Sequence, residues 1–218
     1  MIRLQNINKR YPTEAVTAVR DLSLIISPGE SIALMGPSGC GKTTLLNLIG
    51  AMDVPSSGEI LFEGKPLGSY RPHHAYRANV IGFIFQFHHL IPSLTLRENV
   101  ELPMYPLRIS AAVRAARAAG LLESIGLGER INFYPHRVSG GERQRAAIAR
   151  GLANNPRLIL ADEPTGSVDS ETGEQVIGFL LDQCRETGAA LVMATHNPTI
   201  SAMADRVLQM RDGQIVLD

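Results

Sequence analysis

The chain has 218 residues, of which 44% are hydrophobic and 19% are charged, a composition typical of a folded globular domain. Lys plus Arg and Asp plus Glu each number 21, so the formal net charge is zero. We therefore expect no nucleic-acid partner, because nucleic-acid-binding proteins usually carry a basic excess. The two cysteines, Cys40 and Cys184, are too few for a disulfide framework and favour a reduced, cytosolic setting. No apolar run approaches the roughly 18–20 residues that span a bilayer, so the chain is not expected to cross a membrane by itself.

Short apolar runs alternate with longer helical patterns, which predicts an α/β fold with a mostly parallel sheet. The run at 31–35, Ser-Ile-Ala-Leu-Met, lacks polar alternation and is typical of a buried parallel strand. In chain order, the elements predicted outside the middle of the chain are strands at 22–27, 31–35, 80–85, 158–161 and 190–194, helices at 42–49 and 171–185, and a hairpin over 206–217 that turns at Asp212-Gly213.

The middle of the chain, 87–153, is mostly helical in pattern. Residues 111–125 are rich in Ala, Arg and Leu, which are good helix formers, and Gly126 is placed to end that helix. A second helix is predicted at 142–153. We therefore expect one domain, 1–218, in which 1–86 and 154–218 form the α/β core and 87–153 form an inserted helical sub-domain.

A glycine-rich loop lies between the predicted strand at 31–35 and the predicted helix at 42–49. Its residues are Gly36, Pro37, Ser38, Gly39, Cys40, Gly41, Lys42, Thr43 and Thr44. In this context the pattern is a phosphate-binding motif, because glycines let backbone N–H groups point at phosphate oxygens and the helix adds its positive N-terminal dipole. Lys42 is expected to reach the β- and γ-phosphates, and the Thr43 hydroxyl to bind Mg²⁺.

The predicted strand at 158–161 is followed by two carboxylates, Asp162 and Glu163. Adjacent strand residues point to opposite sides, so the two acids can have different roles. Asp162 is the candidate Mg²⁺ ligand, and Glu163 is the candidate general base that polarises the attacking water. Taken alone, the pair is equally a solvated strand end, but the phosphate loop favours the catalytic interpretation.

A second glycine turn, Ser139-Gly140-Gly141-Glu142, precedes the predicted helix at 142–153. Ser139 is a good N-cap, and the N–H groups that follow it form another anion site. On its own the turn is only a helix cap. With Val138 in place of Leu and Glu142 in place of Gln, however, it resembles the signature motif of ABC-type ATPases, Leu-Ser-Gly-Gly-Gln.

The resemblance extends over essentially the whole chain. The family's other functional positions match Gln86 in the Q-loop, Asp169 in the D-loop, His196 as the switch histidine and Tyr11 as the aromatic residue that stacks on adenine. The fold that this implies is a P-loop NTPase core with a mostly parallel sheet, an antiparallel β sub-domain and the inserted helical sub-domain.

The resemblance also implies a mechanism. Two copies pair head to tail when ATP binds, and each ATP lies between 36–44 of one copy and 139–142 of the other. The second turn then stabilises charge in the transition state, as an arginine finger does elsewhere. The implied Mg²⁺ ligands are Thr43, Gln86 and Asp162, and the implied catalytic set is Lys42, Gln86, Glu163 and His196.

Two segments, 84–92 and 94–103, resemble the branch that contains the lipoprotein-releasing and macrolide-exporter ATPases. This implies a peripheral subunit, on the cytoplasmic face of the inner (plasma) membrane, that drives export or lipoprotein extraction through integral membrane permease subunits. The alternative is a mechanotransmission ATPase that controls periplasmic cell-wall hydrolases through a membrane partner. A chromosome-maintenance or translation ATPase is disfavoured, because those proteins carry long coiled-coil insertions or tandem ATPase domains.

Overall fold

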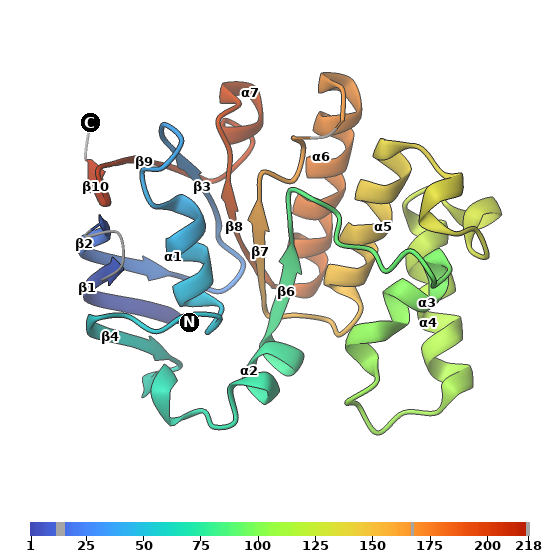
Figure 1. The fold of residues 1–218 in the computed structure, drawn as a ribbon, viewed down its shortest axis with the longest axis horizontal. Helices are drawn as coiled ribbons and strands as arrows, with labels where there is room; N and C mark the ends of the chain where they lie inside the picture. Colours follow the sequence, from blue (N-terminus) through green and yellow to red (C-terminus); the bar gives the residue numbers. More distant parts are fainter. Residues whose placement is uncertain (12–15, 167, 217–218) are drawn as a thin grey trace.

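The computed structural model describes residues 1–11, 16–166 and 168–216 and arranges their strands in two sheets (Figure 1). The larger sheet has the strand order β10-β9-β3-β8-β7-β6. Its members are β3 (Ser31–Met35), β6 (Ile81–Ile84), β7 (Leu158–Asp162), β8 (Ala190–Ala194), β9 (Arg206–Arg211) and β10 (Gln214–Val216). All neighbouring pairs from β9 to β6 are parallel, whereas β10 is antiparallel to β9 at the edge.

The smaller sheet is antiparallel where its strands pair and has the order β2-β1-β4-β5. Its members are β1 (Ile2–Tyr11), β2 (Val16–Ile26), β4 (Ser57–Phe62) and β5 (Lys65–Pro66). Figure 1 shows α1 (Lys42–Ile49) between the two sheets. Its apolar residues, among them Leu45 and Ile49, are buried in one cluster with residues of both sheets. The phosphate loop is therefore fixed by a helix that packs on two sides.

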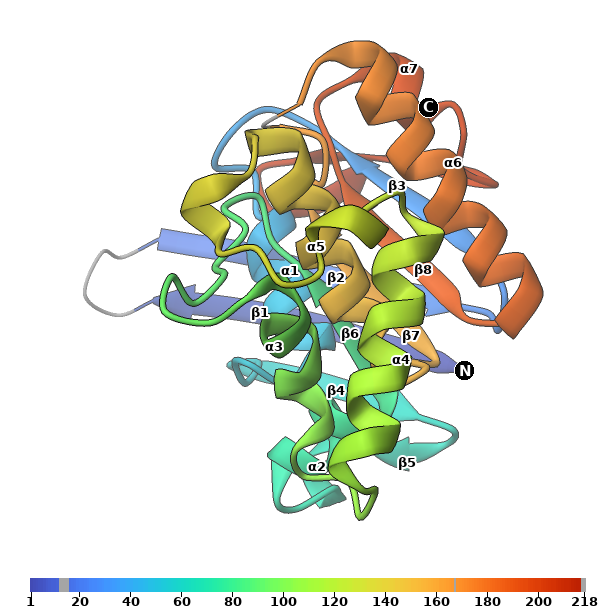
Figure 2. The ribbon, with the colours of Figure 1, turned by 90° about the vertical axis from the view of Figure 1, so that its right-hand side faces the viewer.

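The remaining helices lie around the larger sheet or beyond its β6 edge. They are α2 (His73–Val80), α3 (Leu96–Glu101), α4 (Ala111–Ser124), α5 (Gly140–Leu152), α6 (Ser170–Thr187) and α7 (Pro198–Ser201), with short 3₁₀ helices at Leu67–Ser69, Leu102–Met104, Gly128–Arg130 and Pro135–Arg137. Figure 1 shows α3, α4 and α5 together at one end of the molecule, the side that faces the viewer in Figure 2. They share a hydrophobic cluster of their own, which includes Leu96, Leu122 and Ala146. A further cluster joins α6 to the larger sheet.

The predicted elements outside the antiparallel sheet are present with small shifts of their ends. The predicted helix at 111–125 is α4, which ends one residue early and is followed by Gly126 in the left-handed region (φ 73°). The hairpin turns at Asp212-Gly213, whose φ values are 49° and 81°. The strand predicted at 80–85 was wrong at Val80, which is the last residue of α2. Val80 lies one helical turn after Tyr76, and both side chains are buried, so Val80 belongs to the buried face of that helix. Among the described residues, no helix has the length and apolarity needed to cross a membrane.

Candidate active site

The phosphate loop connects the buried strand β3 to α1. Glycine is required at two of its positions, Gly36 (φ 152°) and Gly41 (φ 105°), where other residues rarely fit. A Cβ atom on Gly36 would lie 2.2 Å from the Met210 carbonyl oxygen, and one on Gly41 would lie 2.2 Å from the Ala18 carbonyl oxygen. The loop therefore lies directly on the backbone of β2 and β9, which fixes its shape.

The Lys42 ammonium is folded back over this loop. It donates hydrogen bonds to the carbonyl oxygens of Gly36 (2.7 Å) and Pro37 (3.0 Å), and the side chain is buried. The Cys40 thiol lies beneath the loop, 3.9 Å from Lys42 Nζ and 5% exposed. Gly213 N also donates to the Cys40 carbonyl oxygen (3.0 Å), so the β9–β10 hairpin supports the loop from behind. Lys42 is thus held at the mouth of a rigid turn whose following helix has free N–H groups in its first turn.

Asp162, at the end of β7, meets the first turn of α1. The Thr43 hydroxyl donates to its carboxylate at 2.8 Å (Oγ1 to Oδ2). The pKa of Asp162 is raised, chiefly because burial disfavours the charged carboxylate, although the hydrogen bond from Thr43 acts in the opposite direction. A half-buried carboxylate beside a hydroxyl oxygen is a donor set suited to a hard cation such as Mg²⁺, which would favour ionised Asp162.

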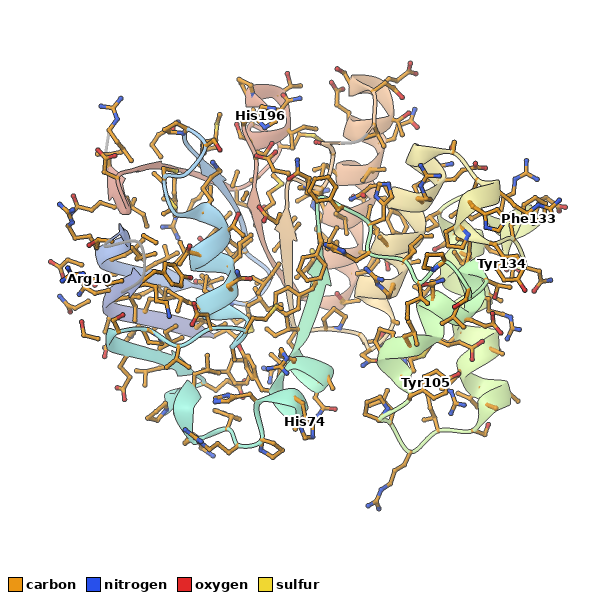
Figure 3. The ribbon with its side chains drawn as sticks, viewed as in Figure 1. Arg10, His74, Tyr105, Phe133, Tyr134 and His196 are labelled. Carbon is orange, nitrogen blue, oxygen red and sulfur yellow. The ribbon has the colours of Figure 1, made fainter. Side chains whose placement is uncertain are left out.

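Glu163 and His196 are brought together because β7 and β8 are neighbours. Asp162 pairs with Ala194 in the parallel register, and Glu163 N donates to the Ala194 carbonyl oxygen (2.9 Å). Glu163 has a φ of 46°, an uncommon conformation for a non-glycine residue, and its carboxylate accepts a hydrogen bond from His196 Nδ1 (2.9 Å). His196 is 75% exposed and lies just beyond β8 (Figure 3), whereas Glu163 is 16% exposed. This bond leaves the second ring nitrogen of His196 available to another partner.

These groups line one cavity of about 490 Å³. The predicted site residues that line it are Gly36, Pro37, Ser38, Gly39, Gly41, Lys42, Thr43, Thr44, Gln86, Asp162, Glu163 and His196. Ala18 of β2 also lines it and was missed, since a small residue in a strand carries no signal of its own. The described residues contain no cluster of three or more His, Cys, Asp or Glu side chains suited to a metal ion, so Mg²⁺ would need further ligands from water or phosphate.

Cys40, which lies beneath the loop, does not line this cavity, and three further predicted groups lie outside it. Tyr11, at the end of β1, donates its hydroxyl to Asp53 (2.8 Å) and has Lys9 Nζ 4.8 Å from its ring centroid. Asp169 is the N-cap of α6 and accepts hydrogen bonds from the backbone N–H (2.9 Å) and the hydroxyl (2.8 Å) of Thr172. Both hydrogen bonds lower the pKa of Asp169, and the bond from the Thr172 backbone has the larger effect. Contact of either residue with nucleotide remains a prediction.

The third group is the turn before α5, which has a complete capping box. Glu142 N donates to Ser139 Oγ (3.2 Å), and Ser139 N donates to Glu142 Oε2 (2.8 Å). The hydrogen bond from the Ser139 backbone is the main cause of a lowered pKa for Glu142. The turn lies on the helical side of the molecule. Figure 3 places Phe133 and Tyr134, from the segment before it, far from His196. The two turns predicted to bind anions thus do not line the same cavity.

Gln144 is a site-supporting residue that the sequence analysis missed. It is fully buried on α5, donates from Nε2 to the Pro164 carbonyl oxygen (2.8 Å), and accepts from His88 Nδ1 at Oε1 (2.7 Å). It connects the helix that starts at the second turn with the backbone next to Glu163 and with the segment after Gln86. A polar residue on the buried face of a predicted amphipathic helix was the available signal.

The chain is similar to proteins of one known family. Residues 19–166 match the family described as ABC transporter. A lipoprotein-releasing system ATP-binding protein, LolD 2 of Caulobacter vibrioides, is 43% identical over 100% of this chain and 97% of that protein. A macrolide export ATP-binding/permease protein of Paracoccus denitrificans is also 43% identical, over 100% of this chain and 33% of that protein. A dimeric, post-hydrolysis structure of an ATP-binding cassette bound to ADP and Pi superposes with a TM-score of 0.93 at 39% identity, covering 100% of this chain and 97% of that one.

Proposed function

We propose that this chain, which belongs to the ABC transporter family and is an ATPase of that family, is the motor subunit of a membrane complex that exports substrates or extracts lipoproteins through separate permease subunits. The observation that carries the proposal is the separation of its two anion sites. One site holds Lys42, Asp162 and Glu163, and the other is the Ser139 turn on the helical side. A second copy, paired head to tail, would bring the Ser139 turn to the open side of the cavity.

In this proposal the cavity binds the triphosphate of ATP. The backbone N–H groups of 36–44 and the Lys42 ammonium hold the β- and γ-phosphates. Thr43, Asp162 and Gln86 would hold Mg²⁺, which neutralises phosphate charge when it is bound. Tyr11 would stack on adenine, and Asp169 would contact the opposite copy. The dimeric cassette with ADP and Pi supports the pairing and the nucleotide.

Hydrolysis is proposed to start from a water molecule placed between Glu163 and the γ-phosphorus. The Glu163 carboxylate accepts the water proton as a new bond forms from the water oxygen to phosphorus. The bond from the γ-phosphorus to the bridging oxygen breaks, and ADP and inorganic phosphate are the products. His196, hydrogen-bonded to Glu163 at 2.9 Å, would contact the γ-phosphate, and the Ser139 turn of the partner would stabilise the charge on it.

The export or lipoprotein-extraction role is supported by equal identity to two relatives of that branch, both 43%. One relative combines ATP-binding and permease parts, and this chain spans 33% of it. The proposed location is therefore the cytoplasmic face of the membrane, through contact with permease subunits. The alternative role, control of cell-wall hydrolases through a membrane partner, would use the same motor.

Two measurements test the proposal. Glu163→Gln keeps the shape of the side chain but removes the general base, so it should bind ATP, hydrolyse it very slowly and accumulate as a dimer in light scattering. A monomer at saturating Mg-ATP would contradict the composite site.

Affinity purification from detergent-solubilised membranes should then recover a permease with a periplasmic domain. A partner that binds cell-wall hydrolases would favour the alternative, and recovery of no membrane partner would contradict both.

A further inference from the structure

We propose that Arg130 is a positioning residue of the composite ATP site, because its guanidinium neutralises the Glu142 carboxylate and lets the Ser139 turn approach the phosphates held by the partner copy. The inference rests on the proposed function, since it concerns the turn that would face ATP across the dimer. It assigns a role to a residue that lies outside every motif recognised in the sequence.

Glu142 brings a negative charge to a turn that must bind an anion. The signature motif that this turn resembles has the neutral amide Gln at this position. In the present chain both carboxylate oxygens are engaged: Oε2 accepts from Ser139 N (2.8 Å), and Oε1 accepts from Arg130 Nε (3.3 Å). The carboxylate is therefore fixed beside the N–H groups that would bind phosphate, and it would repel a polyphosphate unless its charge were compensated.

Arg130 is held in place for this compensation. Its Cζ lies 4.9 Å from the centroid of the Phe133 ring, an arrangement that orients the guanidinium plane. Its backbone is fixed on both sides, because Arg130 N donates to Leu127 O (2.9 Å) and Phe133 N donates to Arg130 O (2.9 Å). Phe133 O in turn accepts from Leu96 N (2.8 Å) at the start of α3, so the segment is joined to the helical layer.

A neighbouring cation is engaged elsewhere. The Arg143 guanidinium donates to the carbonyl oxygens of Val138 (2.7 Å) and Pro135 (3.3 Å), on the backbone that leads into the turn. It supports the shape of the turn, whereas Arg130 is the guanidinium that contacts the Glu142 carboxylate.

The ion pair contributes little to folding of the single chain. The side chains of Arg130 and Glu142 are 44% and 23% exposed, and exposed pairs are screened by water. The same pair becomes important when a second copy covers the turn, because water is then displaced and the charges act through a lower dielectric. The effect of Arg130 is therefore expected on ATP binding and dimer closure and not on the stability of the free chain.

The test combines Arg130→Met, Glu142→Gln and the double variant. Methionine keeps an apolar stem against Phe133 but removes the charge. We expect Arg130→Met to raise the KM for ATP by about tenfold, and to raise by a similar factor the ATP concentration that dimerises the Glu163→Gln form. In the double variant, both values should lie within about threefold of those of the Glu142→Gln single variant, because no negative charge is left for Arg130 to compensate.

Matched controls separate charge from structure. Arg137→Met removes the other guanidinium over the Phe133 ring, 5.5 Å from its centroid, and should leave KM unchanged. Arg130→Lys keeps a charge and should be close to wild type, and the melting temperatures of the variants should agree within about 3 °C.

A normal KM for Arg130→Met, or a defect that persists in the Glu142→Gln background, overturns the inference while the wild-type chain still hydrolyses ATP. If instead the Glu163→Gln parent with native Arg130 does not dimerise with ATP, the proposed function fails, and the inference fails with it.

Discussion

Replacing His196 with Ala should separate catalysis from stability. The imidazole is 75% exposed, so its hydrogen bond to Glu163 should contribute no more than about 1 kcal/mol to the free energy of unfolding. For a chain of this length that corresponds to a fall in Tm of about 2–4 °C or less. If His196 both orients Glu163 and contacts the γ-phosphate, its removal should lower kcat by about 100- to 1,000-fold, which is about 2.7–4 kcal/mol of transition-state stabilisation.

The assay is steady-state ATP hydrolysis at saturating Mg-ATP, with thermal unfolding of the same proteins measured without nucleotide. His74→Ala is the matched control, because His74 is an exposed histidine on α2, at the opposite end of the view from His196 (Figure 3). The control should keep wild-type kcat. A His196→Ala protein with kcat within threefold of wild type would refute the catalytic role. A fall in Tm of more than about 6 °C would show that the histidine acts mainly through folding.

Three further changes should give distinct results in unfolding and ATPase assays. Gly41→Ala should destabilise the nucleotide-free chain by ~2–4 kcal/mol, because its Cβ would lie 2.2 Å from the Ala18 carbonyl oxygen; Gly39→Ala, also at positive φ but with no described atom within 4 Å, should lose only ~1 kcal/mol. Asp162→Asn should lose ATPase activity by at least about 100-fold yet raise Tm at pH 7, since burial raises the native pKa of Asp162; the gain should vanish well below the unfolded-state pKa of about 3.9, where the carboxyl is protonated in both native and unfolded chains, and a gain independent of pH would contradict this. Gln144→Leu should lower the free energy of unfolding by ~1–3 kcal/mol, because it leaves a buried carbonyl without its donor, and should also lower kcat; an unchanged kcat would show that Gln144 does not position the general base.

The arrangement of the phosphate loop was predictable because its residues are neighbours in the sequence. A buried strand, a glycine loop and a helix that follow one another leave little freedom for Lys42 and Thr43, and the structure places both in one cavity. Glu163 and His196 are 33 residues apart, and their contact depends on β7 and β8 being neighbours in the sheet. Residue patterns alone do not determine that pairing, so the resemblance to a family was needed to bring the two residues together.

The antiparallel sheet was the least predictable part of the fold. Strand β1 contains the polar run Gln5-Asn6 and pairs with β2 through register shifts, with Asn6 at a φ of 49°. Such irregular pairing interrupts the alternation by which a strand is recognised. Helix α2 was missed for a related reason: it has only eight residues, and Tyr76 and Val80 are its buried side chains, which is too short a repeat to separate from a strand.

The two turns proposed to bind anions are connected within one chain through α5. The helix begins at the Ser139 turn, and one turn later Gln144 is bonded to Pro164, next to Glu163, and to His88, two residues after Gln86. The position of the turn that would face the partner's ATP is therefore tied to the backbone next to Glu163, the proposed general base. Gln144 is fully buried, and both its hydrogen bonds are shorter than 2.9 Å. A shift of α5 relative to β7 would therefore either break these hydrogen bonds or move their partners together with the helix. In the proposed head-to-tail dimer, closure at one composite site and alignment of Glu163 at the other would therefore depend on the same buried amide.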